Sequence, residues 1–130
     1  MKNLQIAVCD YEKNIIDSLA RKQIILFKTR QKTYTLRKND IYYIENQLKK
    51  IVIHTAIENI EVYGSMKDIE EKLDDGFYRC HRGYLVNMAH IRAYGSSSIQ
   101  LTNGDNIFLS KDKYGDFENA YMTYLQDGKL

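Results

Sequence analysis

Between residues 23 and 64, short runs of β-branched and aromatic residues alternate with polar breaks of a few residues. Such runs are typical of β-strands. They are QIILFK, KTYTLR, DIYYIE, IVIHT and NIEVYG. Parallel pairing of neighbouring strands needs a crossover of a dozen or more residues, which these breaks are too short to supply. The pattern therefore predicts antiparallel strands joined by tight turns.

A short helix is predicted after these strands, because apolar residues then recur at helical spacing. The apolar stripe consists of Met66, Ile69 and Leu73. Ser65 stands before the stripe and Asp68 follows three residues later, an arrangement close to the Ser/Thr-x-x-Glu capping box. Gly76 is expected to close the helix, since glycine readily takes the left-handed conformation at helix ends.

The C-terminal part of the chain combines an irregular segment, a hairpin and a second helix. The stretch FYRCHRGYLVNMAHI, residues 77–91, has no single period. The next stretch, AYGSSSIQLTNGDNIFLS, predicts a hairpin whose Asn103-Gly104 pair favours a type I′ turn. Ser110 is placed to cap a last helix. Apolar positions at helical spacing in that helix are Tyr114, Phe117, Tyr121, Tyr124 and Leu125.

Residues 1–22 form a separate unit in this interpretation. LQIAV is a short apolar strand, and in EKNIIDSLARK the residues Ile15, Ile16 and Leu19 share one helical face. We therefore divide the chain into a strand-helix segment, residues 1–22, and a domain, residues 23–130.

Length and composition fit one small domain with its own core: 130 residues, 44% of them hydrophobic. No run approaches the roughly 18 apolar residues needed to cross a bilayer, and no secretory signal is visible. We expect a cytoplasmic protein that does not engage a membrane. Cys9 and Cys80 fit neither a disulfide framework nor a metal-ligand spacing. They are either plain reduced thiols or, at Cys80 between Arg79 and His81, a reactive one.

Common catalytic motifs are absent from the sequence. It has no G-x-G-x-x-G, no phosphate-binding P-loop and no H-E-x-x-H. His54, His81 and His90 lack metal-ligand spacing with one another or with cysteine. We therefore expect no enzyme activity, no cofactor and no metal site.

Charge is unevenly distributed, although the formal net charge is only +2. Residues 58–75 are rich in carboxylates, whereas residues 79–92 carry Arg79, Arg82, Arg92 and two histidines without any carboxylate. Because an unpaired buried charge is very costly, some of these arginines must face solvent or an anion. Guanidinium suits both phosphate and guanine. The alternative is salt bridging to the acidic helix at 68–75. Asn87 is interpreted as a structural hydrogen-bonding residue.

Two further basic patches stand at predicted turns. Lys49 and Lys50 follow ENQL between two strands, either as a solvated hairpin tip or as a probe for a phosphate backbone. Lys111 and Lys113 stand in SKDKYGDF at a helix N-terminus, which attracts phosphate. Lysine in a first helical turn is mildly unfavourable for the helix itself, and Asp112 lies between the two.

Three stretches together resemble the LytTR DNA-binding domain over about residues 24–125. They are DIYYIE, GSMKDIEEKLDDGFYRCHRGYLVNMAHI and NGDNIFLSK. FYRCHRGYLVNMAHI is similar to the family signature F-x-R-x-H-R-S-Y-L-V-N-x-x-x-I, with Gly83 in place of serine. The resemblance implies a mainly β fold of small antiparallel sheets with a short helix alongside and a C-terminal helix. It also implies a bacterial transcription regulator whose loops enter successive major grooves of double-stranded DNA.

The resemblance also implies where DNA contacts fall: the loop before IVIHT, the position after the CH pair, and the residues after LS. These are the patches that the charge pattern indicates. The predicted DNA-binding residues are Lys49, Lys50, Arg79, His81, Arg82, Lys111 and Lys113. The implied partner is promoter DNA with paired short repeats, bound by a homodimer or by tandem protomers.

The stretch LQIAVCDYEKNIIDSLARK resembles the first strand and helix of a response-regulator receiver, with Asp10 and Glu12 split by Tyr11. A receiver needs a full domain of about 100 residues, so no phosphorelay is expected. The rival hypothesis is a receiver-less interaction module that sequesters or competes with a full-length response regulator. RNA binding through the 11 tyrosines is disfavoured, because tyrosine at strand spacing usually belongs to a core.

Overall fold

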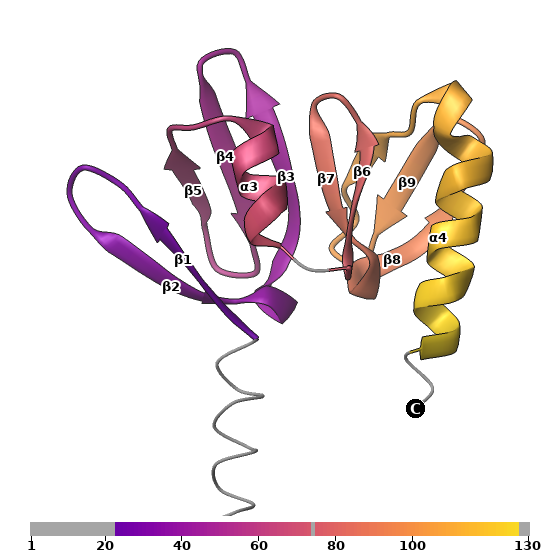
Figure 1. The fold of residues 1–130 in the computed structure, drawn as a ribbon, viewed down its shortest axis with the longest axis horizontal. Helices are drawn as coiled ribbons and strands as arrows, with labels where there is room; N and C mark the ends of the chain where they lie inside the picture. Colours follow the sequence, from indigo (N-terminus) through magenta and orange to yellow (C-terminus); the bar gives the residue numbers. More distant parts are fainter. Residues whose placement is uncertain (1–22, 74, 128–130) are drawn as a thin grey trace, which may run out of the picture.

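The computed structural model describes residues 23–73 and 75–127 (Figure 1). The strands are β1 (Ile24–Lys28), β2 (Thr33–Arg37), β3 (Ile41–Gln47), β4 (Lys50–Thr55), β5 (Asn59–Val62), β6 (Phe77–His81), β7 (Tyr84–Asn87), β8 (Ile91–Tyr94), β9 (Ser98–Leu101) and β10 (Asn106–Phe108). The helices are α3 (Met66–Lys72), α4 (Tyr114–Asp127) and the short 3-10 turns η1 (Lys38–Asp40), η2 (Met88–His90) and η3 (Lys111–Lys113). The predicted mainly β fold is confirmed. The predicted strand-helix unit over residues 1–22 lies outside the described residues.

The strands form three small sheets, and every strand pairing in the described part of the chain is antiparallel, as predicted. β1 pairs with β2, β10-β9-β8 form a second sheet, and the largest sheet has the order β5-β4-β3-β7-β6. The stretch 77–91, which showed no single period, folds as the β6–β7 hairpin followed by η2. A register shift between Arg79 and His81 interrupts the alternation of this hairpin, which explains the missing period.

The large sheet separates two hydrophobic cores, because successive side chains of a strand point to opposite faces. Ile44 of β3 and Leu85 of β7 lie in the first core, with β1, β4, β5 and α3. Their neighbours Tyr43 and Val86 lie in the second core, with β8, β9, β10 and α4. Figure 1 shows α3 over β3–β5 and α4 beside β8 and β9. The sheet is therefore buried on both sides by different parts of the chain.

Asn87, the last residue of β7, links that strand to the start of β3. It is a buried polar side chain, only 4% exposed. Its Nδ2 donates to the carbonyls of Lys38, at 3.0 Å, and Ile41, at 2.8 Å. Its Oδ1 accepts from the N–H of Ala89 at 3.0 Å. The structural interpretation of Asn87 is confirmed, since the side chain ties the end of β7 to the start of β3.

The α3 helix begins as predicted and ends earlier than predicted. The Ser65 hydroxyl accepts a hydrogen bond from the Asp68 N–H at 3.0 Å. At the other end Leu73, not Gly76, is the capping residue, and its backbone is extended (φ −95°, ψ 156°). The prediction for Gly76 was wrong because Leu73 leaves the helix to pack against the first core.

The β9–β10 hairpin is confirmed, but its turn is not type I′. A type I′ turn needs positive φ at both central residues. In this loop only Gly104 has it, at 95°. The N–H of Gly104 donates to the Leu101 carbonyl at 2.9 Å, and the Asn103 side chain accepts from the N–H of Asp105 at 3.0 Å. The loop spans four residues, Thr102 to Asp105, which is too long for a two-residue primed turn.

The last helix is confirmed, with two differences in detail. Ser110 occupies the capping position before η3, yet its side chain makes no capping hydrogen bond. Its N–H instead donates to the Cys80 carbonyl at 2.9 Å, which fixes η3 to β6. Phe117 is fully buried, with the Tyr94 ring edge-on at 5.0 Å. Leu125 is 40% exposed and lies outside the buried stripe. Among the described helices, none is long and apolar enough to span a membrane.

Candidate nucleic-acid interface

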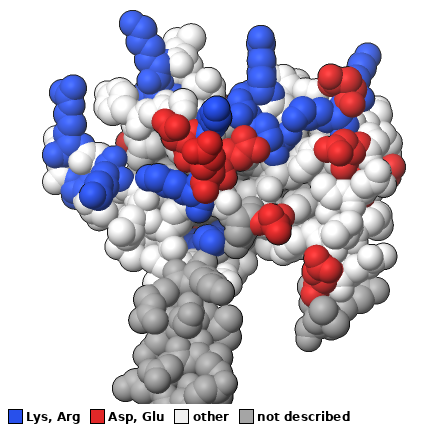
Figure 2. All heavy atoms as spheres, viewed as in Figure 1, with Lys and Arg blue, Asp and Glu red and all other residues white. Residues whose placement is uncertain are grey.

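Three turns that are distant in sequence reach the same edge of the molecule. They are the β3–β4 turn (residues 47–50), the β6–β7 turn (81–84), and η3 with the residue before it (110–113); we call them together the turn edge. In Figure 1 all three lie at the top of the view. Figure 2 shows lysine and arginine side chains that project beyond the surface along that top edge. The fold thus gathers the three basic patches that the charge pattern indicates.

The β3–β4 turn carries Leu48 and Lys49 at its tip, between the paired residues Gln47 and Lys50. Lys49 is exposed and has no ion-pair partner among the described residues. Lys50 differs, because its Nζ lies 2.9 Å from a carboxylate oxygen of Glu61 on β5. Of the two lysines, Lys49 is therefore the one whose charge is left uncompensated.

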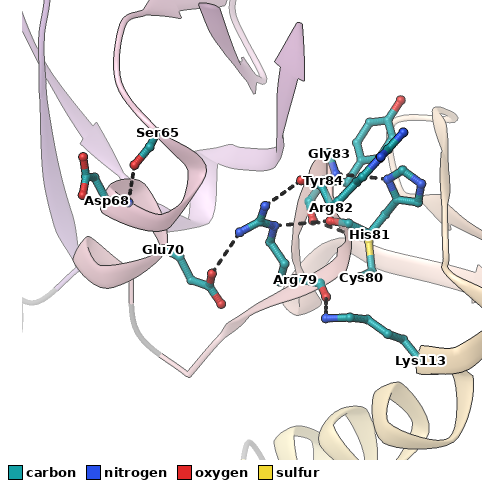
Figure 3. A network of polar contacts seen from close by, with 10 residues as sticks. All are labelled: Ser65, Asp68, Glu70, Arg79, Cys80, His81, Arg82, Gly83, Tyr84 and Lys113. Atoms are coloured by element: carbon teal, nitrogen blue, oxygen red, sulfur yellow. Dashed lines mark hydrogen bonds and ion pairs between the residues drawn. The ribbon is translucent and has the colours of Figure 1, made fainter. Parts of the chain in front are cut away.

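The Arg79 side chain supports the β6–β7 turn by hydrogen bonds to backbone carbonyls, as Figure 3 shows. Its guanidinium donates to the carbonyl of Arg82 at 2.6 Å and to the carbonyl of His81 at 3.3 Å. The same group pairs with Glu70 of α3 at 3.3 Å. The proposed salt bridging to the acidic helix is thus present for Arg79. Arg82 itself is exposed, and no described carboxylate pairs with it.

His81 is held by the turn it belongs to. Its Nδ1 accepts a hydrogen bond from the backbone N–H of Gly83, with the two nitrogens 3.1 Å apart. The centre of its ring lies 5.8 Å from the centre of the Tyr84 ring and 6.0 Å from that of the Phe108 ring. A Cβ at Gly83 would lie an ordinary 3.5 Å from His81, so the serine of the family signature would also fit.

The two lysines of η3 have different environments. The Lys113 Nζ folds back, donates to the Arg79 carbonyl at 3.0 Å and lies 5.8 Å from the centre of the Tyr78 ring. Lys111 is exposed, without an ion-pair partner in the described part of the chain. Each turn therefore presents one uncompensated cation, and these are Lys49, Arg82 and Lys111.

Cys80 is not a reactive thiol, and that interpretation of the sequence was wrong. Its side chain is 0% exposed, and its sulfur lies 3.4 Å from the Phe108 carbonyl oxygen. Cys80 is the buried residue of β6 and lies in the second core, whereas Arg79 and His81 are partly exposed. Burial raises the pKa of the Cys80 thiol to about 12, so the thiolate is scarce at neutral pH. The described residues also hold no group of three or more His, Cys, Asp or Glu that could bind a metal.

A fourth basic region was missed by sequence reasoning. Residues 23–39, which include the β1–β2 hairpin, contain five cations and no carboxylate. Those cations are Lys28, Arg30, Lys32, Arg37 and Lys38. The hairpin turn is ordered by Thr29, whose hydroxyl accepts from the N–H of Lys32 at 3.1 Å and donates to its carbonyl at 2.9 Å. In Figure 2 basic side chains cover this hairpin at the left. The run without carboxylates was visible in the sequence and could have revealed it.

Comparisons with known proteins agree on one family. The family model described as LytTr DNA-binding domain matches residues 31–122. Accessory gene regulator protein A of Staphylococcus epidermidis is 32% identical over 76 residues, which cover 55% of this chain and 32% of that protein. Transcriptional regulatory protein NatR of Bacillus subtilis is 27% identical over 105 residues, covering 75% and 45%. The chain thus spans less than half the length of these relatives.

A solved structure shows the same fold. It is the LytTr DNA-binding domain of a methyl-accepting/DNA response regulator from Bacillus cereus. The superposition has a TM-score of 0.64 at 24% sequence identity, and it covers 77% of this chain and 96% of that one. The sheets and helices described above are therefore a known arrangement.

Proposed function

Because the chain belongs to the LytTR DNA-binding domain family, we propose that it is a bacterial transcription regulator that binds double-stranded DNA in a sequence-specific manner. Its three turns would enter successive major grooves on one face of the duplex. The target would be a pair of short repeats, occupied by two protomers side by side in the cytoplasm.

The observation that supports this proposal is the set of three uncompensated cations on the turn edge. Lys49, Arg82 and Lys111 come from different turns, and none has a carboxylate partner among the described residues. Charges left free in this way can neutralise phosphates without first breaking an internal ion pair. Arg82 can also form a bidentate contact to guanine, whereas the lysines act as point charges on the backbone.

The other predicted residues support the turns in this proposal. Arg79 and Lys113 donate to carbonyls of the β6–β7 hairpin, so they position Arg82 from within the protein. A side chain that projects from a well-packed part of the protein loses less conformational freedom on binding than one on a mobile tail. The rival interaction module would use residues 1–22 as its surface, and these lie outside the described residues.

The proposal is tested by selecting fragments from random duplex DNA with the purified chain, then titrating the selected duplex at several salt concentrations. The logarithm of the affinity should fall linearly with the logarithm of the salt concentration, with a slope of about −0.9 per phosphate contact. Three cations on the duplex predict a slope near −3 or steeper. Failure to enrich any duplex, or a slope close to zero, would contradict DNA binding by this surface.

The basic β1–β2 hairpin should add sequence-independent contacts to flanking phosphates. Replacing Lys28, Arg30 and Lys32 with glutamine is expected to make the salt slope shallower by about 2 to 3, since each lost phosphate contact changes it by about 0.9. Binding to specific and to random duplexes should weaken by a similar factor. Arg92→Gln, which removes an exposed arginine on β8, serves as the control. An unchanged slope in the triple variant would remove the hairpin from the interface.

A further inference from the structure

Leu48 has an unusual backbone and an unusual environment for a leucine. It lies at the tip of the β3–β4 turn with its side chain 97% exposed. Its φ is 57°, and among the described residues other than glycine it alone has a positive φ. That region disfavours side chains with a Cβ and is normally occupied by glycine, asparagine or aspartate. Leucine therefore contributes neither burial nor a favourable backbone to this turn.

The backbone of the turn is nevertheless set by the paired strands beneath it. Gln47 and Lys50 close the turn as a paired position of β3 and β4. Directly below it, Ile51 is buried in the first core, together with Ile44 of β3. The strands under the turn are therefore paired and packed, and they carry Leu48 at their tip. Strained residues that the surrounding structure holds in place are found preferentially at functional sites.

Its surroundings distinguish Leu48 from another exposed apolar residue at a turn. Ile57, in the β4–β5 turn, is also 90% exposed, but it is followed by the acidic residue Glu58. Its turn lies at the opposite ends of the strands from the turn edge (Figure 1). Leu48 is followed by Lys49 and Lys50 on the turn edge. Of these two lysines only Lys49 is uncompensated, since Lys50 pairs with Glu61. An apolar side chain beside an uncompensated cation suits a partner that is anionic on its outside and has an apolar group within reach.

We propose that Leu48 reads thymine by packing against its C5-methyl group in the major groove, while Lys49 contacts the adjacent phosphate. This inference rests on the proposed DNA-binding function and names a base-reading residue within it. Among the base edges in the major groove, the thymine methyl is the apolar group, and side chains such as alanine and the threonine methyl are known to contact it. Leucine at this position would then be retained for recognition, at the expense of turn stability.

Single replacements of thymine by deoxyuridine test this directly, because they remove the methyl group and leave hydrogen bonding intact. In the duplex selected with the unaltered chain, one such replacement should weaken binding about fourfold, equivalent to ~0.8 kcal/mol for one buried methyl group. Leu48→Asn should bind that duplex more weakly than the unaltered chain and should be indifferent to the same replacement. Its melting temperature should be equal or higher, because asparagine tolerates positive φ.

Ile57→Asn is the matched control, since it removes an exposed apolar residue from a turn away from the turn edge, and it should keep the full methyl dependence. Equal binding of all deoxyuridine duplexes by the unaltered chain would overturn the inference. The same sensitivity in Leu48→Asn as in the unaltered chain would also overturn it. If no duplex is bound at all, the proposed function itself fails, which is a separate and recognisable result.

Discussion

Arg82→Ala is expected to weaken binding to the selected DNA site about 5- to 150-fold while the protein stays folded. A bidentate arginine contact to guanine is worth about 1–3 kcal/mol of discrimination, which corresponds to that range. Binding to random duplex should fall much less, because only one phosphate-neutralising charge is lost there. Titrations of both duplexes by fluorescence anisotropy at one fixed salt concentration measure the difference.

The stability of this variant should be close to that of the unaltered chain. The Arg82 side chain is exposed and pairs with no described carboxylate, so alanine removes no ion pair. The turn itself is held through the Arg82 carbonyl, which accepts from Arg79 at 2.6 Å and is present whatever the side chain. A changed melting temperature together with weaker binding would indicate a structural role for Arg82 instead.

The control for this experiment is Arg92→Ala, which removes an exposed arginine from β8. Its effect on the specific site should be small. Glu70→Ala is not a neutral control, although it lies on the acidic helix, because Glu70 pairs with Arg79 and so takes part in holding the turn. Comparable losses in Arg82→Ala and Arg92→Ala would mean that general charge, rather than the turn edge, accounts for DNA affinity.

Asn87→Ala is expected to reduce the free energy of unfolding by about 3–5 kcal/mol. The change removes three hydrogen bonds to backbone groups, those of Lys38, Ile41 and Ala89. A buried polar group left without a partner costs about 1–3 kcal/mol. Urea denaturation followed by circular dichroism measures the loss as a shift of the transition midpoint at an unchanged slope.

Asn106→Ala provides the comparison, because Asn106 is exposed on β10. It should change the free energy of unfolding by less than about 0.5 kcal/mol, the usual range for surface substitutions. A loss below 1 kcal/mol in Asn87→Ala would show that water replaces the missing amide, and that Asn87 is dispensable for joining β7 to β3.

Most strands could be predicted from the sequence because their side chains obey a simple period. β1 is an example, since its exposed and buried residues alternate and its hydrophobic run is bounded by polar breaks. The β6–β7 hairpin was not recognised as such, because a register shift and the following η2 break its period. The type I′ assignment at Asn103-Gly104 failed for a related reason, since the length of a loop depends on strand register, which is a tertiary property.

The three turns were indicated by the sequence, but the different environments of their basic side chains were not. Charge pattern and family resemblance indicated all three turns, and nothing in the sequence distinguishes Lys111 from Lys113. Lys113 folds back onto a backbone carbonyl of β6, a partner that exists only after η3 has packed against that strand. The case of Leu48 is similar, because its exposure and positive φ follow from the geometry of the turn and are not encoded in its residue type.

The strand order β5-β4-β3-β7-β6 has a consequence for any attempt to divide this chain. A fragment of residues 23–73 keeps β3 and β4 yet loses β7, so the inner side of β3 becomes an open row of unpaired amides and carbonyls. Residues 75–127 face the same problem at β7. Such open rows recruit strands from other molecules, so each half alone is prone to self-association. We therefore expect fragments divided at residue 74 to self-associate, whereas moving residues 23–127 together keeps the β3–β7 pairing.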